Sequence, residues 1–201
     1  AQGKYAGVPV LAGNTEDEFP FVIDAQNEEE LEKKASAWFC KKAEEFLAIP
    51  QVHEQTKDGY APVSGMELMT KAAFLLNEKS VKPANCYYYR FAPDIPGEDH
   101  PGTFHSVDLW FFFETLAKCW RPFVGRHYDL ARQMCNYWAN FIKCGDPNGT
   151  DDDGKTLPKW NPYQENDRAE MVFTAQGAKS GNEKNSKLME FLLSDRIERM
   201  K

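Results

Sequence analysis

A run of aromatic residues at positions 86–91 (CYYYRF) constrains the fold of this chain more than any other feature. The run contains neither glycine nor proline, and Ala92 and Pro93 follow it directly. Aromatic side chains favour a pleated strand, and proline cannot continue one in the middle of a sheet. The run therefore predicts a buried strand, followed at 93–105 by a loop rich in proline, glycine and acidic residues.

Two further apolar runs and four helical patterns accompany this strand. Residues 8–14 (VPVLAGN) and 171–174 (MVFT) are short apolar segments, so each predicts a strand. Strands interspersed with helices indicate the α/β class, with one domain for a chain of 201 residues. The helical spacing of apolar residues predicts helices at 27–48, 65–77, 128–144 and 183–199.

These patterns also predict which large side chains lie in the core. Trp38 falls on the apolar stripe of the helix at 27–48, and Met66 and Met69 fall on that of the helix at 65–77. Residues 110–113 (WFFF) form a dense apolar segment, and we expect them to be mostly buried.

Composition excludes two classes of partner. The chain is 42% hydrophobic, which is enough to build a core, and it has 24 basic against 31 acidic side chains, a formal charge of -7. An acidic chain without a basic stripe is not expected to bind nucleic acid or an anionic membrane surface. No apolar run approaches the roughly 18 residues that a membrane-spanning helix requires.

The five cysteines are widely spaced and form no C-x-x-C pair. We expect buried free thiols, and an odd count of unpaired cysteines leans towards a reducing compartment such as the cytoplasm. Residues 1–5 (AQGKY) have neither an initiator methionine nor a signal-peptide pattern. We therefore expect the chain to begin within a longer protein or to have been processed.

His105 is the principal candidate for chemistry. It lies on a loop that opens with glycine and runs into the apolar segment, within residues 102–113 (GTFHSVDLWFFF). Imidazole can take and return a proton near neutral pH, so a histidine placed in this way predicts a general base.

The remaining histidines predict less. His53 and His127 have no partner pattern and are expected at the surface or at helix caps. The acids and histidines of the loop lack the i, i+4 spacing that fixes two metal ligands on one helix face, so we expect no metal site and no cofactor. The residues considered for this metal cluster are Asp94, Glu98, Asp99, His100 and His105.

Four blocks stand out in order along the chain: 8–19 (VPVLAGNTEDEF), 102–109 (GTFHSVDL), 137–141 (YWANF) with 145–149 (GDPNG), and 160–163 (WNPY). Together they resemble the C-terminal part of the type-B carboxylesterases, the family of bacterial para-nitrobenzyl esterases, animal carboxylesterases and cholinesterases. Within that family, the sequences of 119–123 (CWRPF) and 128–138 look most like the bacterial branch.

The resemblance implies an α/β-hydrolase fold and a catalytic triad of serine, glutamate and histidine. The family's acid matches Glu18, and its histidine matches His105. Phe19 follows the matched acid where the family commonly has glycine, so Glu16 remains an alternative acid. Asp108 is expected to start a helix or to be a buried partner of the site rather than the catalytic acid.

The triad nucleophile is absent from the sequence. No G-x-S-x-G occurs, residues 177–181 (GAKSG) have the wrong spacing, and no His-Gly-Gly segment is present to supply oxyanion-hole amides. We therefore expect residues 1–201 to be the C-terminal portion of one α/β-hydrolase domain that is inactive alone. Within it, 27–80 would form a helical wall or cap, and 81–201 would contain the terminal strands, the histidine loop and the last helices.

This interpretation implies particular partners. The substrate would be a small-molecule carboxylic ester, and the strand at 8–14 would present an open sheet edge. That edge would bind the missing N-terminal part of the same esterase or a second copy of the chain. The alternative is a non-catalytic cholinesterase-like binding or adhesion module, because this fold also occurs without its serine.

Overall fold

The computed structural model describes residues 7–182 and 185–200 of the chain. The chain divides into two compact units, of which the first comprises Ala1–Glu18 with Ala73–Glu183 and the second comprises Phe19–Ala72 with Lys184–Lys201. Each unit contains its own sheet and its own apolar core. Two sequence expectations, the start of the last helix at Glu183 and the interpretation of residues 1–5, fall outside the described residues. The role of 27–80 as a wall or cap stays a prediction.

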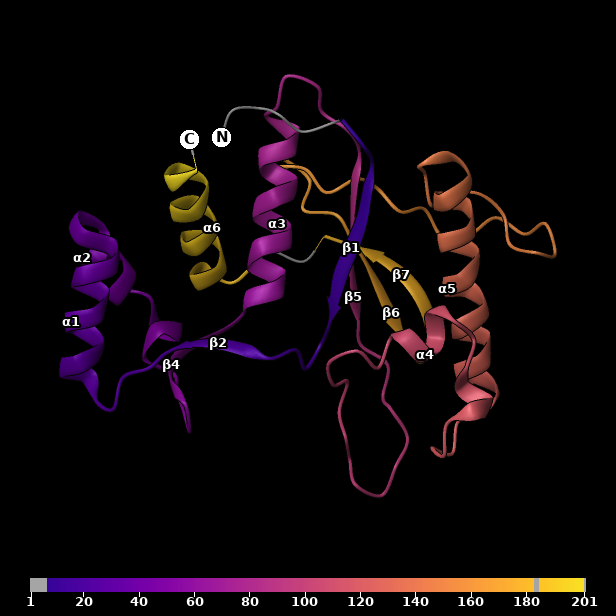
Figure 1. Cartoon of the computed structure of the whole chain (residues 1–201), viewed down its shortest axis with the longest axis horizontal. Helices are drawn as coiled ribbons and strands as arrows, with labels where there is room; N and C mark the ends of the chain where they lie inside the picture. The colour runs from indigo at the N-terminus through magenta and orange to yellow at the C-terminus, as the bar shows by residue number, and fades with distance from the viewer. Residues whose placement is uncertain (1–6, 183–184, 201) are drawn as a thin grey trace. The chain divides into compact units, whose positions relative to one another are not determined.

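A four-stranded sheet in the order β1-β5-β6-β7 forms the centre of the first unit (Figure 1). β1, β5 and β6 are parallel to one another, and β7 is antiparallel to β6. The three predicted strands are confirmed to within two residues. The last strand was not predicted, because its sequence GAKSG has almost no apolar residues. The strands are β1 (Val10–Thr15), β5 (Cys86–Phe91), β6 (Glu170–Thr174) and β7 (Gly177–Gly181).

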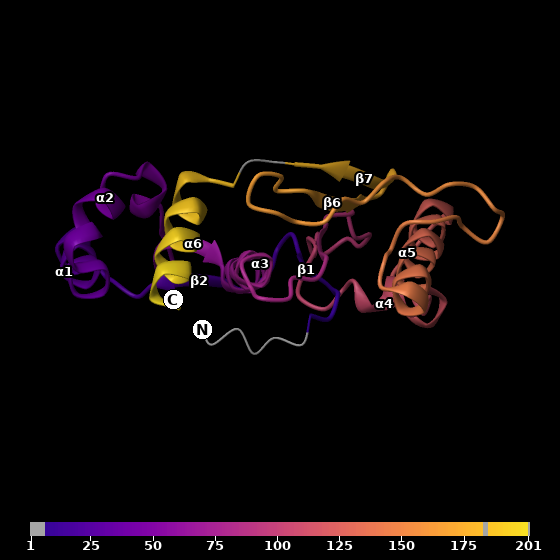
Figure 2. The ribbon, with the colours of Figure 1, turned by 90° about the horizontal axis from the view of Figure 1, so that it is seen from above.

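The tyrosines of β5 alternate between the two faces of this sheet. Tyr87 and Tyr89 belong to the core cluster that also contains apolar residues of α5 (Gly125–Cys144). Tyr88 faces the other way, and its ring lies 5.8 Å from that of Tyr163. Strand residues point alternately to opposite faces, so one aromatic run builds both sides of the sheet. Figure 2 shows α5 at the β7 side of the sheet.

β1 and β5 approach each other very closely at Gly13. Gly13 is the register partner of Tyr89, and a Cβ atom at position 13 would lie 2.0 Å from the Tyr89 carbonyl oxygen and 2.5 Å from its ring. Such contacts are far inside van der Waals distance, so glycine is required at this point of the strand.

The second unit is built on a small antiparallel sheet in the order β2-β4-β3. The sequence patterns did not predict this sheet, because its strands are short and β4 contains Pro62, a residue that argues against a strand. The helices α1, α2 and α6 contribute to its core, as does the segment Pro50–His53. The strands are β2 (Pro20–Ile23), β3 (Gln55–Thr56) and β4 (Gly59–Ser64), and the helices are α1 (Glu28–Phe39), α2 (Ala43–Leu47) and α6 (Lys187–Arg199).

The single helix predicted at 27–48 is wrong, because the chain breaks it at Cys40. Cys40 has φ 51°, in the left-handed region, and a short 3₁₀ turn at Cys40–Lys42 separates α1 from α2. The apolar face continues across the break, since the rings of Phe39 and Phe46 lie 4.4 Å apart and both contact Phe191. A helix-period pattern therefore marks the buried face without revealing where the backbone bends.

Four of the side chains expected in the core are exposed instead. Trp38 is 42% exposed, and Met66 and Met69 of α3 (Gly65–Glu78) are 52% and 46% exposed. Of the segment 110–113, Phe111 is fully buried in α4 (Leu109–Phe112), whereas Phe113 is 71% exposed just beyond that helix. In each case the apolar residue lies on the outer side of a helix or beyond its end.

The five cysteines are free thiols, as expected, but only Cys86 is fully buried, whereas Cys40 and Cys144 are exposed. Burial raises the pKa of Cys86 to about 11, so this thiol stays protonated at neutral pH. Among the residues that the structure describes, no helix has the length and hydropathy needed to cross a bilayer.

His127 was expected at the surface or at a helix cap, and it is a cap but fully buried. Its Nδ1 accepts a hydrogen bond from the Val124 amide at 2.9 Å, in the first turn of α5. Burial lowers the pKa of His127 below its ordinary value of 6.5, an effect that the Asp94 carbonyl partly opposes. The neutral ring is therefore the form that fits the folded chain.

This pKa shift predicts a pH dependence of stability. The folded state disfavours the protonated ring of His127. The contribution of this residue to the free energy of unfolding is therefore complete above pH 6.5 and is lost as the pH falls towards the lower pKa of the folded state. The slope is at most about 1.4 kcal/mol per pH unit. Denaturant unfolding between pH 5 and 8 should show this loss in the wild type and not in His127→Gln.

His53 provides the matched control. The Leu47 carbonyl and Glu28 raise the pKa of His53, so its contribution should be present at low pH and be lost as the pH rises. The stability that His53→Gln loses relative to the wild type should therefore be largest at low pH, whereas the loss in His127→Gln should be largest at high pH. Identical profiles for the wild type and His127→Gln would contradict the prediction.

Candidate active site

The register of β1 on β5 brings two functional loops together. Thr15 and Phe91, the last residues of these parallel strands, are register partners, and the Glu16 amide donates to the Phe91 carbonyl at 2.8 Å. The acidic loop after β1 and the histidine loop (residues 92–108) therefore leave the sheet at the same edge. In open α/β sheets, ligands bind at this carboxyl edge of the strands.

Asp17 joins the two loops directly. Its backbone amide donates to the Thr103 carbonyl at 3.2 Å, and its carboxylate Oδ2 accepts from the Thr103 amide at 2.6 Å. Gly102 has φ 63°, and a Cβ atom there would lie 2.4 Å from Asp17 Oδ2. Only glycine leaves room for this carboxylate in that backbone conformation, so the glycine that opens the loop has a structural reason.

Glu18 and His105, the two predicted site residues, are in contact. Nδ1 of His105 lies 2.5 Å from Oε1 of Glu18, and the Thr15 hydroxyl donates to the other carboxylate oxygen at 3.3 Å. The Glu18 side chain is 5% exposed, whereas that of His105 is 47% exposed. The arrangement is therefore a buried carboxylate that holds one edge of an imidazole whose ring reaches solvent.

Glu16, the alternative acid, has different partners. Its carboxylate binds Arg90 Nη1 at 2.8 Å, and Arg90 Nη2 binds the buried Glu170 at 3.2 Å. Arg90 thus links acids that follow β1 and begin β6. The structure places Glu18 on His105 and Glu16 on Arg90.

Tyr89 and Asp108 form a buried polar pair near this site. The Tyr89 hydroxyl donates to Asp108 Oδ2 at 2.9 Å, and Asp108 precedes α4 directly, as expected for a helix-start acid. Burial raises the pKa of Asp108, and the negative charge of Glu18 adds to the shift. Burial likewise raises the pKa of Tyr89. No sequence pattern pairs Tyr89 with Asp108, because the histidine loop separates them.

The acids and histidines considered for a metal cluster do not converge. Asp99 binds Arg121 through both carboxylate oxygens, at 2.9 and 3.0 Å. His100 lies on the same loop with φ 44°. In the part of the chain that the structure describes, no group of three or more Cys, His, Asp or Glu side chains could hold a metal ion.

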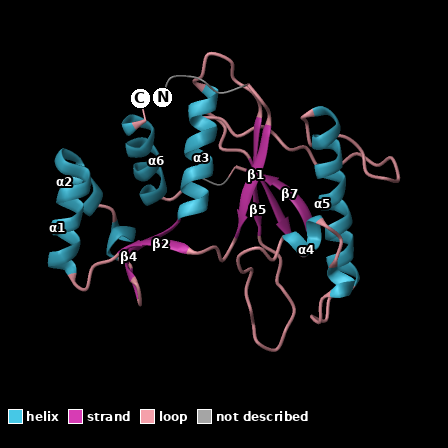
Figure 3. Cartoon of the chain, viewed as in Figure 1, coloured by secondary structure: helices cyan, strands magenta, loops and turns pink. Residues whose placement is uncertain are grey.

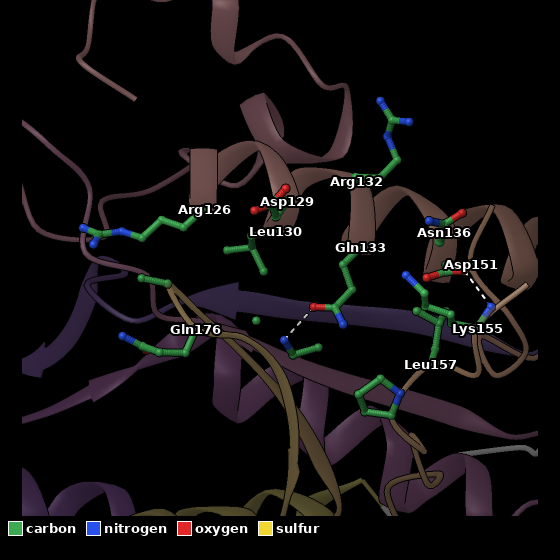
Figure 4. Close-up of a pocket in the computed structure, with 14 residues that line it drawn as sticks. Arg126, Asp129, Leu130, Arg132, Gln133, Asn136, Asp151, Lys155, Leu157 and Gln176 are labelled. Atoms are coloured by element: carbon green, nitrogen blue, oxygen red, sulfur yellow. Dashed lines mark hydrogen bonds between the residues drawn. The ribbon is translucent and has the colours of Figure 1, made fainter. Parts of the chain in front are cut away.

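A groove of about 640 Å³ lies in the first unit, along α5 and the turn between β6 and β7 (Figure 4). The Gln133 side-chain oxygen accepts from the Ala178 amide at 2.7 Å in its centre, and Asp151 accepts from the Lys155 amide at 2.8 Å at one end. Neither Glu18 nor His105 lines this groove. Its mixture of cationic, anionic and amide groups defines no reaction chemistry.

The pair of Glu18 and His105 can accept and return a proton. A carboxylate at Nδ1 fixes the ring orientation and stabilises the imidazolium, which leaves Nε2 as the nitrogen that would exchange the proton. Such a pair needs a nucleophile to act on, and no serine elbow occurs in the sequence. Figure 3 shows the histidine loop as the long irregular segment between β5 and α4.

Known proteins resemble this chain over most of its length. Human (Homo sapiens) cocaine esterase is 23% identical over 194 residues, which are 84% of this chain and 34% of that protein. Liver carboxylesterase 1 of Oryctolagus cuniculus is 25% identical over 192 residues, which are 81% of this chain and 33% of that protein. The chain thus spans about a third of the length of these relatives.

A solved structure titled PNB esterase has the same fold over this region. It superposes with a TM-score of 0.60 at 22% sequence identity, and the match covers 92% of this chain and 38% of that one. The expected α/β-hydrolase fold is therefore confirmed for a partial domain.

The broadest comparison concerns nearly the whole sequence. The family model described as the carboxylesterase family matches residues 1–192. The chain belongs to the carboxylesterase family.

Proposed function

We propose that this chain supplies the acid and the base of a serine carboxylesterase, with Glu18 as the acid and His105 as the general base. The observation that carries the proposal is the 2.5 Å contact between Glu18 Oε1 and His105 Nδ1 at the carboxyl edge of the sheet. Membership of the carboxylesterase family supports ester hydrolysis as the reaction. The substrate class is a small-molecule carboxylic ester.

In the proposed reaction, His105 Nε2 takes the proton of a serine hydroxyl as its oxygen attacks the ester carbonyl. The same nitrogen then gives the proton to the leaving alcohol, and a water molecule repeats the sequence to release the acid. Glu18 holds the ring in the correct tautomer throughout. The serine and the oxyanion-hole amides would come from a segment outside these 201 residues, because neither motif occurs in them.

The proposal predicts that the isolated chain does not hydrolyse esters. Without a nucleophile no acyl-enzyme forms, and each missing oxyanion donor removes about 3 to 4 kcal/mol of transition-state stabilisation. A p-nitrophenyl ester assay of the purified chain should therefore match that of His105→Ala. Turnover well above buffer that His105→Ala abolishes would contradict the proposed incompleteness.

A second prediction distinguishes the two acids in a protein that joins this chain to a segment with the serine nucleophile. There, His105→Ala and Glu18→Gln should each lower kcat, by about 10⁴-fold for loss of the orienting acid. Glu16→Gln should keep most activity, because Glu16 contacts Arg90 rather than the imidazole. If such a protein binds esters without hydrolysing them, the proposed esterase function is wrong and the chain belongs to a non-catalytic binding module.

The open edge of β1 suggests how this chain meets its partner. β1 is hydrogen-bonded to β5 on one side and is the terminal strand of the described sheet. Val10 of this strand is 41% exposed. We propose that the edge pairs with the segment that supplies the nucleophile, and that in its absence two copies of the chain associate there.

This proposal predicts concentration-dependent association of the isolated chain. Lysine on an edge strand disfavours pairing, so Val10→Lys should shift the molar mass measured by light scattering towards the monomer. Val81→Lys is the matched control, because Val81 is 93% exposed and lies outside the strands. A wild-type chain that remains monomeric at all concentrations would contradict self-association.

A further inference from the structure

The histidine loop contains unusual backbone conformations close to His105. His100 and Ser106 have φ values of 44° and 67°, in the left-handed region that non-glycine residues avoid. Such a conformation is strained and persists only where surrounding contacts hold it. The loop must therefore be held from outside.

Two of the contacts that hold it are close to the sheet. Asp17 binds the backbone of Thr103, and the Thr103 hydroxyl donates to the Pro93 carbonyl at 3.0 Å, which closes the base of the loop. Ile95 is buried in the core of the first unit. These contacts leave the outer part of the loop, residues 96–100, to be held by another group.

Arg121 holds this outer part. Its guanidinium donates to both carboxylate oxygens of Asp99, at 2.9 and 3.0 Å, and to the Pro96 carbonyl at 3.1 Å. The Arg121 side chain is only 7% exposed. The same guanidinium holds the pKa of Asp99 below its ordinary value, so the ion pair stays formed at neutral pH.

Arg121 also contacts the residue that precedes His105. Its guanidinium carbon lies 5.6 Å from the centre of the Phe104 ring and 4.6 Å from that of Trp120. Phe104 in turn packs edge-to-face on Trp110 at 5.9 Å. One buried cation therefore links the tip of the loop to the neighbour of the proposed base.

A glycine makes room for this arrangement. A Cβ atom at Gly97 would lie 2.3 Å from Asp99 Oδ1 and 2.4 Å from Arg121 Nη1. The loop backbone thus passes directly against the ion pair, which ties the conformation of the loop to the presence of Arg121.

From these contacts we propose that Arg121 is a positioning residue that keeps His105 on Glu18 by holding the histidine loop through Asp99, Pro96 and Phe104. The inference rests on the proposed function of the pair Glu18 and His105. Arg121 itself touches neither of these side chains in any contact described above, so it acts through the loop and not on the reacting atoms.

The test uses the tautomer of His105 in the isolated chain, measured from the ring ¹⁵N shifts at a pH where the ring is neutral. A carboxylate at Nδ1 places the proton on that nitrogen, and Glu18→Gln supplies the reference for a ring without the carboxylate. Arg121→Ala and Asp99→Asn should both move the signals towards those of Glu18→Gln. Hydrogen exchange of the Thr103 amide should become at least about tenfold faster in both variants.

Two further variants sharpen the test. Arg121→Lys keeps the charge but not the paired hydrogen bonds, so it should give an intermediate tautomer population. Arg132→Ala is the matched control, because Arg132 pairs with Glu114 at 2.5 Å, away from the histidine loop. It should leave the His105 signals and the loop exchange unchanged.

The outcomes separate the inference from the function on which it rests. If Asp99→Asn and folded Arg121→Ala both show the wild-type tautomer of His105 and the wild-type exchange of the Thr103 amide, the positioning role is overturned and the acid–base pair stays intact. This holds even if both variants unfold at a lower denaturant concentration. A wild-type ring that already matches Glu18→Gln would overturn the pair itself. If Arg121→Ala does not fold, Asp99→Asn decides, because Asp99 is half-exposed and its replacement keeps the size of the side chain.

Discussion

The parallel pairing of β1 with β5 is the constraint on which the candidate site depends. Parallel strands are joined by long crossovers, so the acidic loop and the histidine loop are far apart in sequence. The register ends both strands at the same level, with Thr15 opposite Phe91. Asp17 then binds Thr103, and Glu18, one residue after Asp17, meets His105, two residues after Thr103. The contact between acid and base is a consequence of strand register.

Much of the first unit could be predicted from local patterns. The aromatic run of β5 has strong strand propensity, and Pro93, two residues beyond its end, indicates the loop that follows. The long helix α5 was predicted from its periodic apolar face, although it begins three residues earlier than expected. His105 was a candidate from its loop alone, whereas Glu18 and the pairing of the two residues came from resemblance to a family, because spacing alone gives no reason to pair them.

What could not be predicted depends on long-range contacts. The residues alone do not decide whether Glu18 or Glu16 is the neighbour of His105. In the structure, Arg90 of β5 binds Glu16, and Glu18 contacts the imidazole. The break at Cys40 has no glycine or proline to indicate it. The strands of the small sheet in the second unit are too short to show an alternating apolar pattern. No sequence pattern distinguishes Arg121 from the other charged residues, and only the folded loop reveals its partner Asp99.

The close approach at Gly13 has a consequence for how this site can diverge in evolution. The Tyr89 ring is seated against the bare backbone of Gly13, and the hydroxyl of that ring reaches Asp108 beside Glu18. Any side chain at position 13 would displace the ring and, through it, the polar pair near the proposed acid. A substitution in the middle of a strand would therefore be selected against for its effect at the edge of the sheet. No change of side chain at position 89 would make room for it, because the nearest atom to a Cβ at position 13 is the backbone carbonyl oxygen of Tyr89.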